Sequence, residues 1–430
     1  MQATTRRGLG LWMCTALVVG NMIGSGVFLL PASLAPYGGI SIVGWLVSAG
    51  GAICLALVFA HLGAAFPRIG GPYAFAREGF GDFGGFWVAW SYWISIWTTN
   101  AALAVAFVSY STVFRPALGT TPVLAGGTAL GTLWVLTFVN ARGIHEAGQV
   151  QLVTTILKLV PLLAVGAFGF LAFQPGHFEP FNPSGDSPLG AVTATVTLTL
   201  WAFLGLESGT VPAADVHDAS RTIPRATVLG TLIAAGVYIV CSVAVMGIIA
   251  PAELASSTAP FADAAGAIWG PWGRLLIGAG AAISCFGALN GWILIVGQLP
   301  MVVAQDGLFP VAFGRVSSRG TPVAGMIVSG VLSSALVAMN YSRHLVDLFT
   351  FIILLATLST LAPYAFCSLA GFMMGRRHRE LRLSTGASAI AAFAFAYSLW
   401  AIGGAGAEVV YWGFLLLMAG LPVYVWVARQ

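Results

Sequence analysis

Two stretches of the sequence carry clustered glycines inside long apolar segments: GNMIGSGVFLLP at residues 20–31 and WAFLGLESGTVP at residues 201–212. Gly20, Gly24 and Gly26 make the first stretch easy to unwind, because each glycine costs a helix about 1 kcal/mol relative to alanine. A membrane-spanning segment is interrupted only where the break lines a cavity or is buried in protein. Both stretches therefore predict broken helices beside an internal cavity.

The composition of the whole chain is that of a membrane protein. Of its 430 residues, 58% are hydrophobic and 7% are charged, and its mean hydropathy is +0.91. Soluble domains carry about 25% charged residues, so a water-surfaced globule is excluded. The net charge of +4 is too small to indicate nucleic-acid binding. The five cysteines form no CxxC pair, and we expect neither a metal site nor a cofactor.

Hydropathy predicts an all-α, polytopic membrane protein with twelve spans. The predicted spans lie at 9–35, 39–65, 83–113, 122–140, 149–173, 190–212, 226–249, 272–304, 322–340, 346–374, 384–403 and 407–428. With a cytoplasmic N-terminus, all arginines except Arg115, Arg274 and Arg343 fall on the inner side. This bias predicts a multi-pass protein of the plasma (inner) membrane with both termini in the cytoplasm.

The two glycine-rich breaks occupy the first and sixth spans, which correspond to each other in two five-helix halves. Interrupted helices in corresponding positions indicate a transporter site between inverted repeats. The helix start at Ser25 and Gly26 offers free N–H groups to a carboxylate. Carbonyls at Met22 and from Trp201 to Leu204 suit an ammonium group. The alternative is that the glycines only permit close helix packing, but the paired breaks favour a site for an amino-acid zwitterion.

The same residues resemble the amino acid–polyamine–organocation superfamily, and most closely its basic amino acid/polyamine antiporter branch, which contains the bacterial arginine/agmatine antiporter. The resemblance covers nearly the whole chain. It is densest at VVGNMIGSGVFLLPASLA, GGPYAFARE, TLWAFLGLES, SRTIPRAT, NGWILIVGQ, DGLFP and GTPVAG. It implies a single LeuT-like transporter domain over 1–430 with helices 1 and 6 broken. Its parts are a first repeat at about 9–173, an inverted second repeat at about 190–374, and two extra helices at about 384–428.

The resemblance also implies the residues of the site. The carboxylate subsite of the family corresponds to Ser25 and Gly26, and its ammonium subsite to the carbonyls of Met22, Trp201 and Leu204. The other substrate-contacting positions correspond to Ile96, Asn100, Trp201, Trp292 and Ala356. These assignments predict that the substrate lies between the two broken spans and the third, eighth and tenth spans.

Several of these residues also have structural interpretations. The indole of Trp292 can hold a cation for about 0.5–2 kcal/mol, although tryptophans also anchor helices at the membrane interface. Asn100 can bind a ligand or link two helices. Tyr73, Tyr364 and Trp201 correspond to gating positions of the family, and the tyrosines could equally be packing aromatics.

Glu207 in the sixth predicted span and Lys158, the sole lysine, in the fifth lie too deep in apolar segments to be loop charges. Intramembrane charges are costly and indicate function by default. Burial disfavours the charged form of a carboxyl group, which suits Glu207 to proton sensing; a structural carboxyl is the alternative. In several sodium-independent members of the superfamily a lysine on the fifth span replaces sodium, which implies this role for Lys158, unless it is a plain structural lysine. We therefore predict sodium-independent transport.

The resemblance implies a secondary transporter of amino acids that works by alternating access, as an amino acid/amine exchanger or a proton-linked porter. Ile96 and Ala356 stand where the arginine/agmatine antiporter has polar residues. This apolar substitution keeps two alternatives open: a proton-coupled symporter of neutral amino acids, and a polyamine or cationic amino acid antiporter.

Other classes of protein are disfavoured. An enzyme would need clustered nucleophiles, metal ligands or paired acids, whereas the histidines are dispersed near span ends. A channel would need a repeated filter or a ring of charges. The expected partners are a small amino acid or amine and membrane lipid, which the basic stretch at 375–382 would contact. The resemblance adds a possible homodimer, and no nucleic acid is expected.

Overall fold

The computed structural model describes residues 10–24, 26–66, 70–142, 159, 162–207, 216, 218–377 and 382–429. In this part of the chain, eight helices are long and apolar enough to cross a membrane. Shorter apolar helices lie at Leu11–Gly20, Val27–Tyr37, Leu162–Ala172, Pro188–Phe203 and Val323–Met339. They fall in the first, fifth, sixth and ninth predicted spans. The predicted all-α polytopic class is confirmed, and the count of twelve spans stays a prediction.

One group of helices packs around the two breaks. It comprises α1 (Leu11–Met22), α2 (Gly26–Leu34), α3 (Ile40–Ala65), α8 (Pro188–Leu200), the short η4 (Trp201–Phe203) and α9 (Ala219–Ile248). Within it, α9 contacts α1, α2 and α3, and α8 contacts α2 and α3. Gly44 of α3 lies so close to α8 that an added Cβ would meet Thr195 Oγ1 at 2.3 Å. Glycine at this position is therefore required for the approach of α3 to α8. We call this group the bundle.

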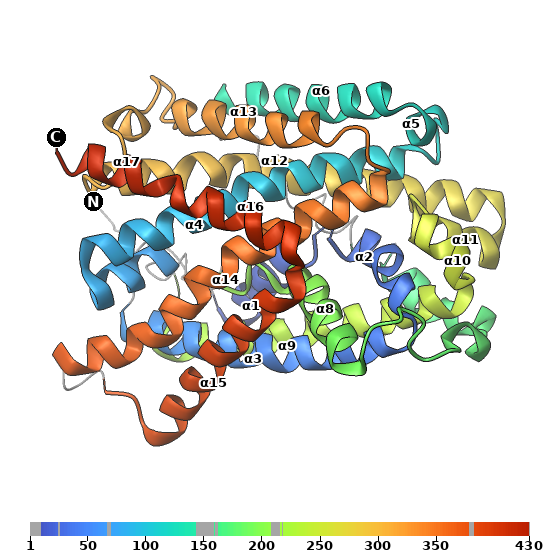
Figure 1. The fold of residues 1–430 in the computed structure, drawn as a ribbon, viewed down its shortest axis with the longest axis horizontal. Coiled ribbons are helices and arrows are strands. Elements are labelled where there is room, and N and C mark those ends of the chain that lie inside the picture. The colour runs from blue at the N-terminus through green and yellow to red at the C-terminus, as the bar shows by residue number, and fades with distance from the viewer. Residues whose placement is uncertain are drawn as a thin grey trace, which may run out of the picture.

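A second group of helices includes α6 and α13, which lie side by side along the top of Figure 1 and pack against α4 and α12. It comprises α4 (Pro72–Ser111), α6 (Pro122–Ala141), α12 (Pro271–Gln305), α13 (Val323–Met339) and α14 (Leu345–Arg377). Asn140 donates to Asn290 between α6 and α12 at 2.7 Å, and Trp93 donates to Ser329 between α4 and α13 at 2.8 Å. Such hydrogen bonds in a membrane contribute about 0.6 kcal/mol each, so they help to join these helices. We call this group the scaffold.

The third predicted span begins earlier than expected. The sequence prediction starts it at residue 83, but α4 begins at Pro72 and changes direction at Gly81, whose φ is 79° and ψ −172°. Only glycine adopts this backbone conformation readily. The glycine-rich stretch before the span is thus helical in part, and it turns before α4 enters the scaffold.

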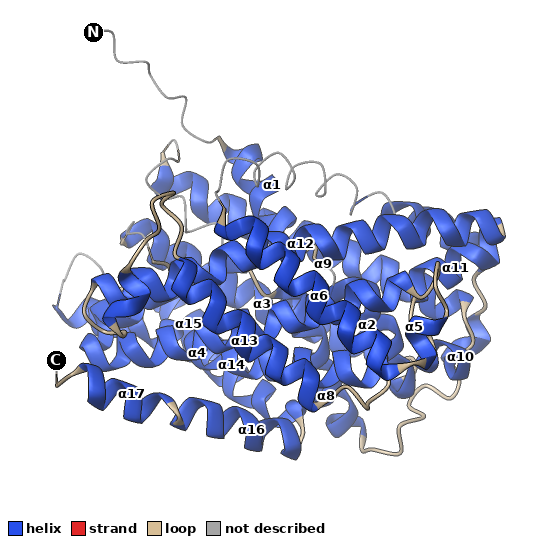
Figure 2. Ribbon diagram, turned by 90° about the horizontal axis from the view of Figure 1, so that it is seen from above, coloured by secondary structure: helices blue, strands red, loops and turns tan. Residues whose placement is uncertain are grey.

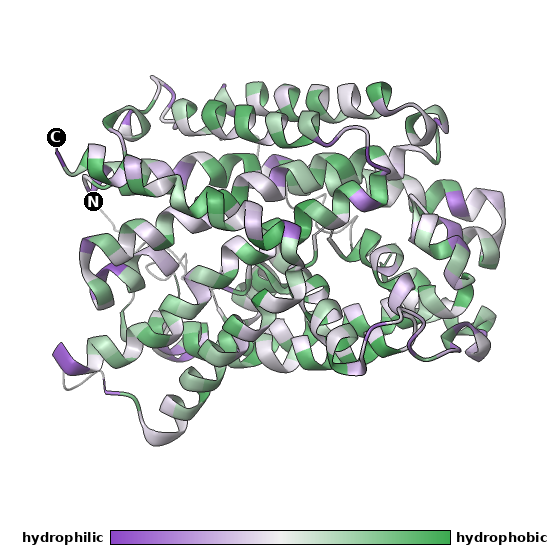
Figure 3. Ribbon diagram, in the orientation of Figure 1, coloured by the Kyte–Doolittle hydropathy of each residue, from purple (hydrophilic) through white to green (hydrophobic). Residues whose placement is uncertain are grey.

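The remaining helices cover the ends and one side of these two groups (Figure 2). Near the ends lie η1 (Ala35–Tyr37), α5 (Ala117–Thr120), η2 (Gly169–Ala172), η3 (Pro175–Phe178), α10 (Pro251–Ser256), α11 (Pro260–Trp269) and η7 (Val311–Gly314). The last helices are α15 (Thr385–Ile402), α16 (Ala407–Met418) and α17 (Gly420–Val427), with η9 (Gly403–Ala405) between the first two. Hydrophobic colouring predominates along the helices in Figure 3, as a lipid-facing protein requires.

Candidate transport site

The first predicted break is present between α1 and α2. Helix α1 ends at Met22, Ile23 leaves the helical conformation with ψ 83°, and α2 begins at Gly26. The Met22 carbonyl accepts a hydrogen bond from the Gly24 N–H at 2.8 Å. The sequence predicted a free carbonyl here, whereas the structure gives it one hydrogen bond. A carbonyl oxygen has a second lone pair, which can still accept from an ammonium group. Ser25 lies outside the described residues.

The second predicted break follows α8. After η4 the chain is extended at Leu204, with ψ 138°, and Gly205 has a φ of 98°. The Trp201 carbonyl accepts from the Leu204 N–H at 3.2 Å, so it too keeps one lone pair. Residues of η4 contact α2, and the two breaks are therefore neighbours in the fold.

The middle of α4 is buried on all sides, because every residue from Trp93 to Ala106 is buried. Tyr92, Ile96 and Asn100 follow each other at intervals of four residues, which places them on one helix face. Asn100 is only 2% exposed, and its Oδ1 accepts no hydrogen bond within the described part of the chain. An unpaired buried acceptor costs about 1–3 kcal/mol. A ligand with an N–H group would remove that cost.

Glu207 lies just beyond the second break and joins the bundle to the scaffold. Its side chain is 2% exposed. Tyr92 of α4 donates to Glu207 Oε1, and Tyr364 of α14 donates to Oε2 at 2.7 Å. We call Tyr92, Glu207 and Tyr364 the Glu207 junction. Tyr364 was predicted as a gating residue, whereas Tyr92 was missed, although its spacing from Asn100 was a usable signal.

Tyr73 lies in a different cluster. Its hydroxyl donates to Asp306 Oδ2 at 2.7 Å, and Arg77 pairs with the same oxygen at 2.8 Å and with Asp82 at 2.8 Å. This cluster joins the start of α4 to the end of α12. Tyr73 therefore has other polar partners than the residues of the Glu207 junction, and its predicted gating role stays a prediction.

The other predicted site residues lie partly on the bundle and partly on the scaffold. Trp201, Ile96 and Ala356 are buried, and Trp292 is partly buried inside α12. Lys158 lies outside the described residues.

Comparison with known proteins now adds a second line of evidence. A family model described as amino acid permease matches residues 9–428. This chain belongs to the amino acid permease family. It is 36% identical over 369 residues to a cadaverine/lysine antiporter of Escherichia coli K12, covering 84% of this chain and 83% of the relative.

Two further relatives span almost the full length of this permease. It is 33% identical over 419 residues to the putrescine transporter PotE of Escherichia coli K12, which covers 97% of this chain and 95% of the relative. It is also 33% identical over 461 residues to a putative arginine/ornithine antiporter of Bacillus subtilis 168, which covers 98% of this chain and 97% of the relative. The resemblance to the basic amino acid/polyamine antiporter branch is therefore confirmed.

The candidate site of this permease contains groups that can bind a ligand by hydrogen bonds. The described residues contain no cluster of metal ligands. The start of α2 presents backbone N–H groups and the positive end of a helix dipole to an anion. The carbonyls at Met22 and Trp201, together with Asn100 Oδ1, can accept hydrogen bonds from cationic nitrogen. Such an arrangement suits a dipolar or cationic amine.

Proposed function

We propose that this permease exchanges a cationic amino acid for a related amine or amino acid across the membrane. The observation that carries the proposal is the contact between α2 and η4, the two interrupted elements, beside α4 with its unpaired Asn100 acceptor. The relatives named as cadaverine/lysine and arginine/ornithine antiporters support long amines and basic amino acids as the substrate class.

The substrate would lie with its carboxylate at Ser25 and Gly26 and its α-ammonium group at the carbonyls of Met22, Trp201 and Leu204. Its side chain would extend toward Asn100 and Trp292, past Ile96 and Ala356. Glu207 would couple the site to protons through its two tyrosine partners. Lys158 would stand in for a coupling sodium ion, so transport needs no sodium.

We also propose the membrane arrangement that the arginines favour: an inner-membrane location with both termini in the cytoplasm. The bundle and the scaffold would then each contain helices from both inverted repeats. Alternating access is movement of one against the other around a fixed site.

Counterflow in proteoliposomes tests the exchange. Vesicles loaded with lysine, ornithine, cadaverine, putrescine or leucine are diluted into sodium-free buffer that contains radiolabelled lysine. Exchange predicts that internal basic amino acid or diamine accelerates uptake, whereas internal leucine does not. Equal uptake into empty and loaded vesicles would contradict exchange, and a strict need for sodium would contradict the role of Lys158.

A second candidate function is proton-coupled symport of neutral amino acids, favoured by the fully buried apolar side chains of Ile96 and Ala356. It predicts that an imposed proton gradient drives leucine accumulation in empty vesicles. The same vesicles distinguish the two functions, because an exchanger leaves leucine uptake unchanged by the gradient.

A further inference from the structure

A second set of contacts joins the scaffold to the bundle at the other end of α4. Tyr110 is fully buried, and its hydroxyl donates to the Phe28 carbonyl of α2 at 2.7 Å. The same oxygen accepts the Phe261 N–H of α11 at 3.4 Å. The Phe28 ring lies edge-to-face against both Tyr110, at 5.7 Å, and Phe261, at 5.4 Å. We call Phe28, Tyr110 and Phe261 the Tyr110 junction.

The two junctions lie on opposite sides of Asn100 along α4. Tyr92 and Tyr110 are 18 residues apart on one helix beyond its bend, which corresponds to about 27 Å at a rise of 1.5 Å per residue. The hydrocarbon core of a bilayer is about 30 Å thick. Asn100 lies between them, so a substrate beside it has one junction on each side.

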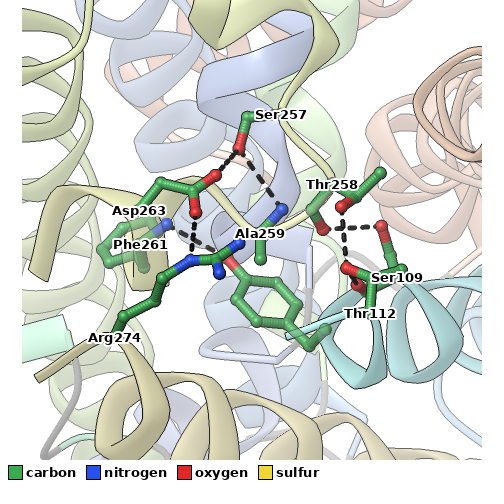
Figure 4. A network of polar contacts seen from close by, with 9 residues as sticks. Ser109, Thr112, Ser257, Thr258, Ala259, Phe261, Asp263 and Arg274 are labelled. Carbon is green, nitrogen blue, oxygen red and sulfur yellow. Dashed lines mark hydrogen bonds and ion pairs between the residues drawn. The ribbon is translucent and has the colours of Figure 1, made fainter. Parts of the chain in front are cut away.

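The segment that carries Phe261 is fixed to the scaffold. Ser109 of α4 donates to the Thr258 carbonyl at 2.6 Å, and Thr112 shares a hydrogen bond with the Thr258 hydroxyl at 2.8 Å. At the other side, Arg274 of α12 pairs with Asp263 at 2.8 Å (Figure 4). The segment from α10 to α11 is thus tied to α4 and α12, and we call it the cap.

Helix α2, in contrast, is held to these elements by few polar contacts. Besides the Tyr110 bond, the described residues provide one further side-chain hydrogen bond from α2 to the scaffold, between Ser33 and Thr350 of α14 at 2.7 Å. Helix α2 also contacts α10 and α11 of the cap, and the ring of Phe28 packs against Phe261 there. Separating α2 from α4 and the cap therefore breaks few hydrogen bonds, and Tyr110 makes the bond nearest to the proposed carboxylate subsite.

We propose that Tyr110 is a positioning residue that holds α2 closed against the cap. Its bond ends at Phe28, two residues after Gly26, where α2 would face the substrate carboxylate. This inference rests on the proposed exchange, because only a carrier must close one end of its path while the other is open. When the Tyr110 bond breaks, α2 leaves the cap and the path opens on that side.

Chemical labelling tests this inference. Ala262 of α11 is fully buried next to Phe261. We would place Ala262→Cys in a chain whose five native cysteines are replaced, and measure its rate of reaction with a membrane-impermeant maleimide. Tyr110→Phe keeps the ring but removes the hydroxyl, and with it the bond to the Phe28 carbonyl and the bond from the Phe261 N–H. We expect an increase of about three- to tenfold in the labelling rate. Tyr397→Phe is the matched control, because the Tyr397 hydroxyl is buried and makes no hydrogen bond within the described residues.

Several outcomes separate the inference from its alternatives. Equal labelling in Tyr110→Phe and Tyr397→Phe would overturn it. If Tyr110→Phe does not fold, Ser33→Ala removes the hydrogen bond between α2 and Thr350 instead. We then expect a smaller increase in the labelling rate, of about twofold. A merely structural tyrosine would not change the ratio of the KM values measured from the two sides of the membrane, whereas a positioning role changes it. Labelling can be measured without transport. If Tyr110→Phe raises the labelling rate but the native protein shows no counterflow, the proposed exchange is refuted while the role of Tyr110 in holding α2 against the cap stands.

Discussion

The Glu207 junction and the Tyr110 junction use the same kind of donor on different acceptors. In both, a tyrosine of α4 donates its hydroxyl to an element of the bundle. The acceptor is a side-chain carboxyl group at Glu207, but it is a backbone carbonyl at Phe28. A carboxyl group can gain a proton and a backbone carbonyl does not at ordinary pH. Of the two acceptors, only the one in the Glu207 junction is an ionisable side chain.

The two junctions also differ in strength. A hydrogen bond to a charged group contributes about 1.5–3 kcal/mol, whereas one between neutral groups contributes about 0.5–1.5 kcal/mol. Glu207 accepts two tyrosine hydroxyls, and Phe28 accepts one. We infer that the Glu207 junction, with its two donors, holds its side closed more firmly than the Tyr110 junction does.

Removal of the carboxyl group gives the largest expected effect. Glu207→Ala leaves two buried tyrosine hydroxyls without their acceptor, which at about 1.5–3 kcal/mol each corresponds to a loss of more than a hundredfold in exchange. Glu207→Gln keeps one acceptor oxygen without the charge, so we expect a loss of about tenfold and a flatter dependence on pH. Both are measured as counterflow rates between pH 5 and pH 8.

Glu408→Gln is the control for these variants, because Glu408 is exposed and pairs with Arg343 far from both breaks in the sequence. A surface pair contributes about 0–1 kcal/mol, so its exchange and its pH profile stay close to those of the native chain. A Glu207→Gln variant with the native pH profile would remove Glu207 from proton coupling.

Weakening the Glu207 junction at a tyrosine gives the next largest effect. Tyr364→Phe removes one hydrogen bond to the carboxyl group, and the population of molecules open on that side rises by about tenfold. Since the other side then stays closed for longer, we expect labelling of Ala262→Cys to fall by a similar factor. An increase in labelling would mean that Tyr364 acts on the same side as Tyr110.

Combining Tyr110→Phe with Tyr364→Phe changes the labelling rate of Ala262→Cys less than the stronger of the two substitutions does alone. Sites more than about 10 Å apart without shared partners act additively, and the junctions are separated by most of the membrane-spanning length of α4. Tyr110→Phe together with Tyr364→Phe should therefore return the labelling of Ala262→Cys to within about threefold of the native rate. A double variant that labels as fast as Tyr110→Phe alone would show that the junctions do not oppose each other.

The sequence predicted the parts of this arrangement that depend on local chemistry. Glycines within an apolar segment weaken a helix wherever they occur, so the breaks after Met22 and at Leu204 could be placed before the structure was known. Glu207 was recognisable because a carboxyl group in an apolar span is costly.

The partners of these groups could not be predicted in the same way. Tyr110 and Phe28 are separated by 82 residues, and Tyr110 and Phe261 by 151. The bond to Phe28 ends on a main-chain oxygen, which every residue possesses, so no residue type marks it in the sequence. Tyr92 is the intermediate case: the helical spacing from Asn100 indicated its face, but not that its hydroxyl reaches Glu207.

The smallest effect is expected at Tyr73, which the resemblance grouped with the gating residues. Tyr73 donates to Asp306, and Arg77 already holds the same oxygen at 2.8 Å. Because Asp306 is 39% exposed, water replaces the lost donor in Tyr73→Phe, and the remaining pair contributes about 0–1 kcal/mol. We expect less than a twofold change in both counterflow and labelling of Ala262→Cys. A tenfold fall in labelling, as for Tyr364→Phe, would instead make the contact between α4 and α12 part of the closure. The comparison would then be between one junction at the Tyr110 side and two at the other.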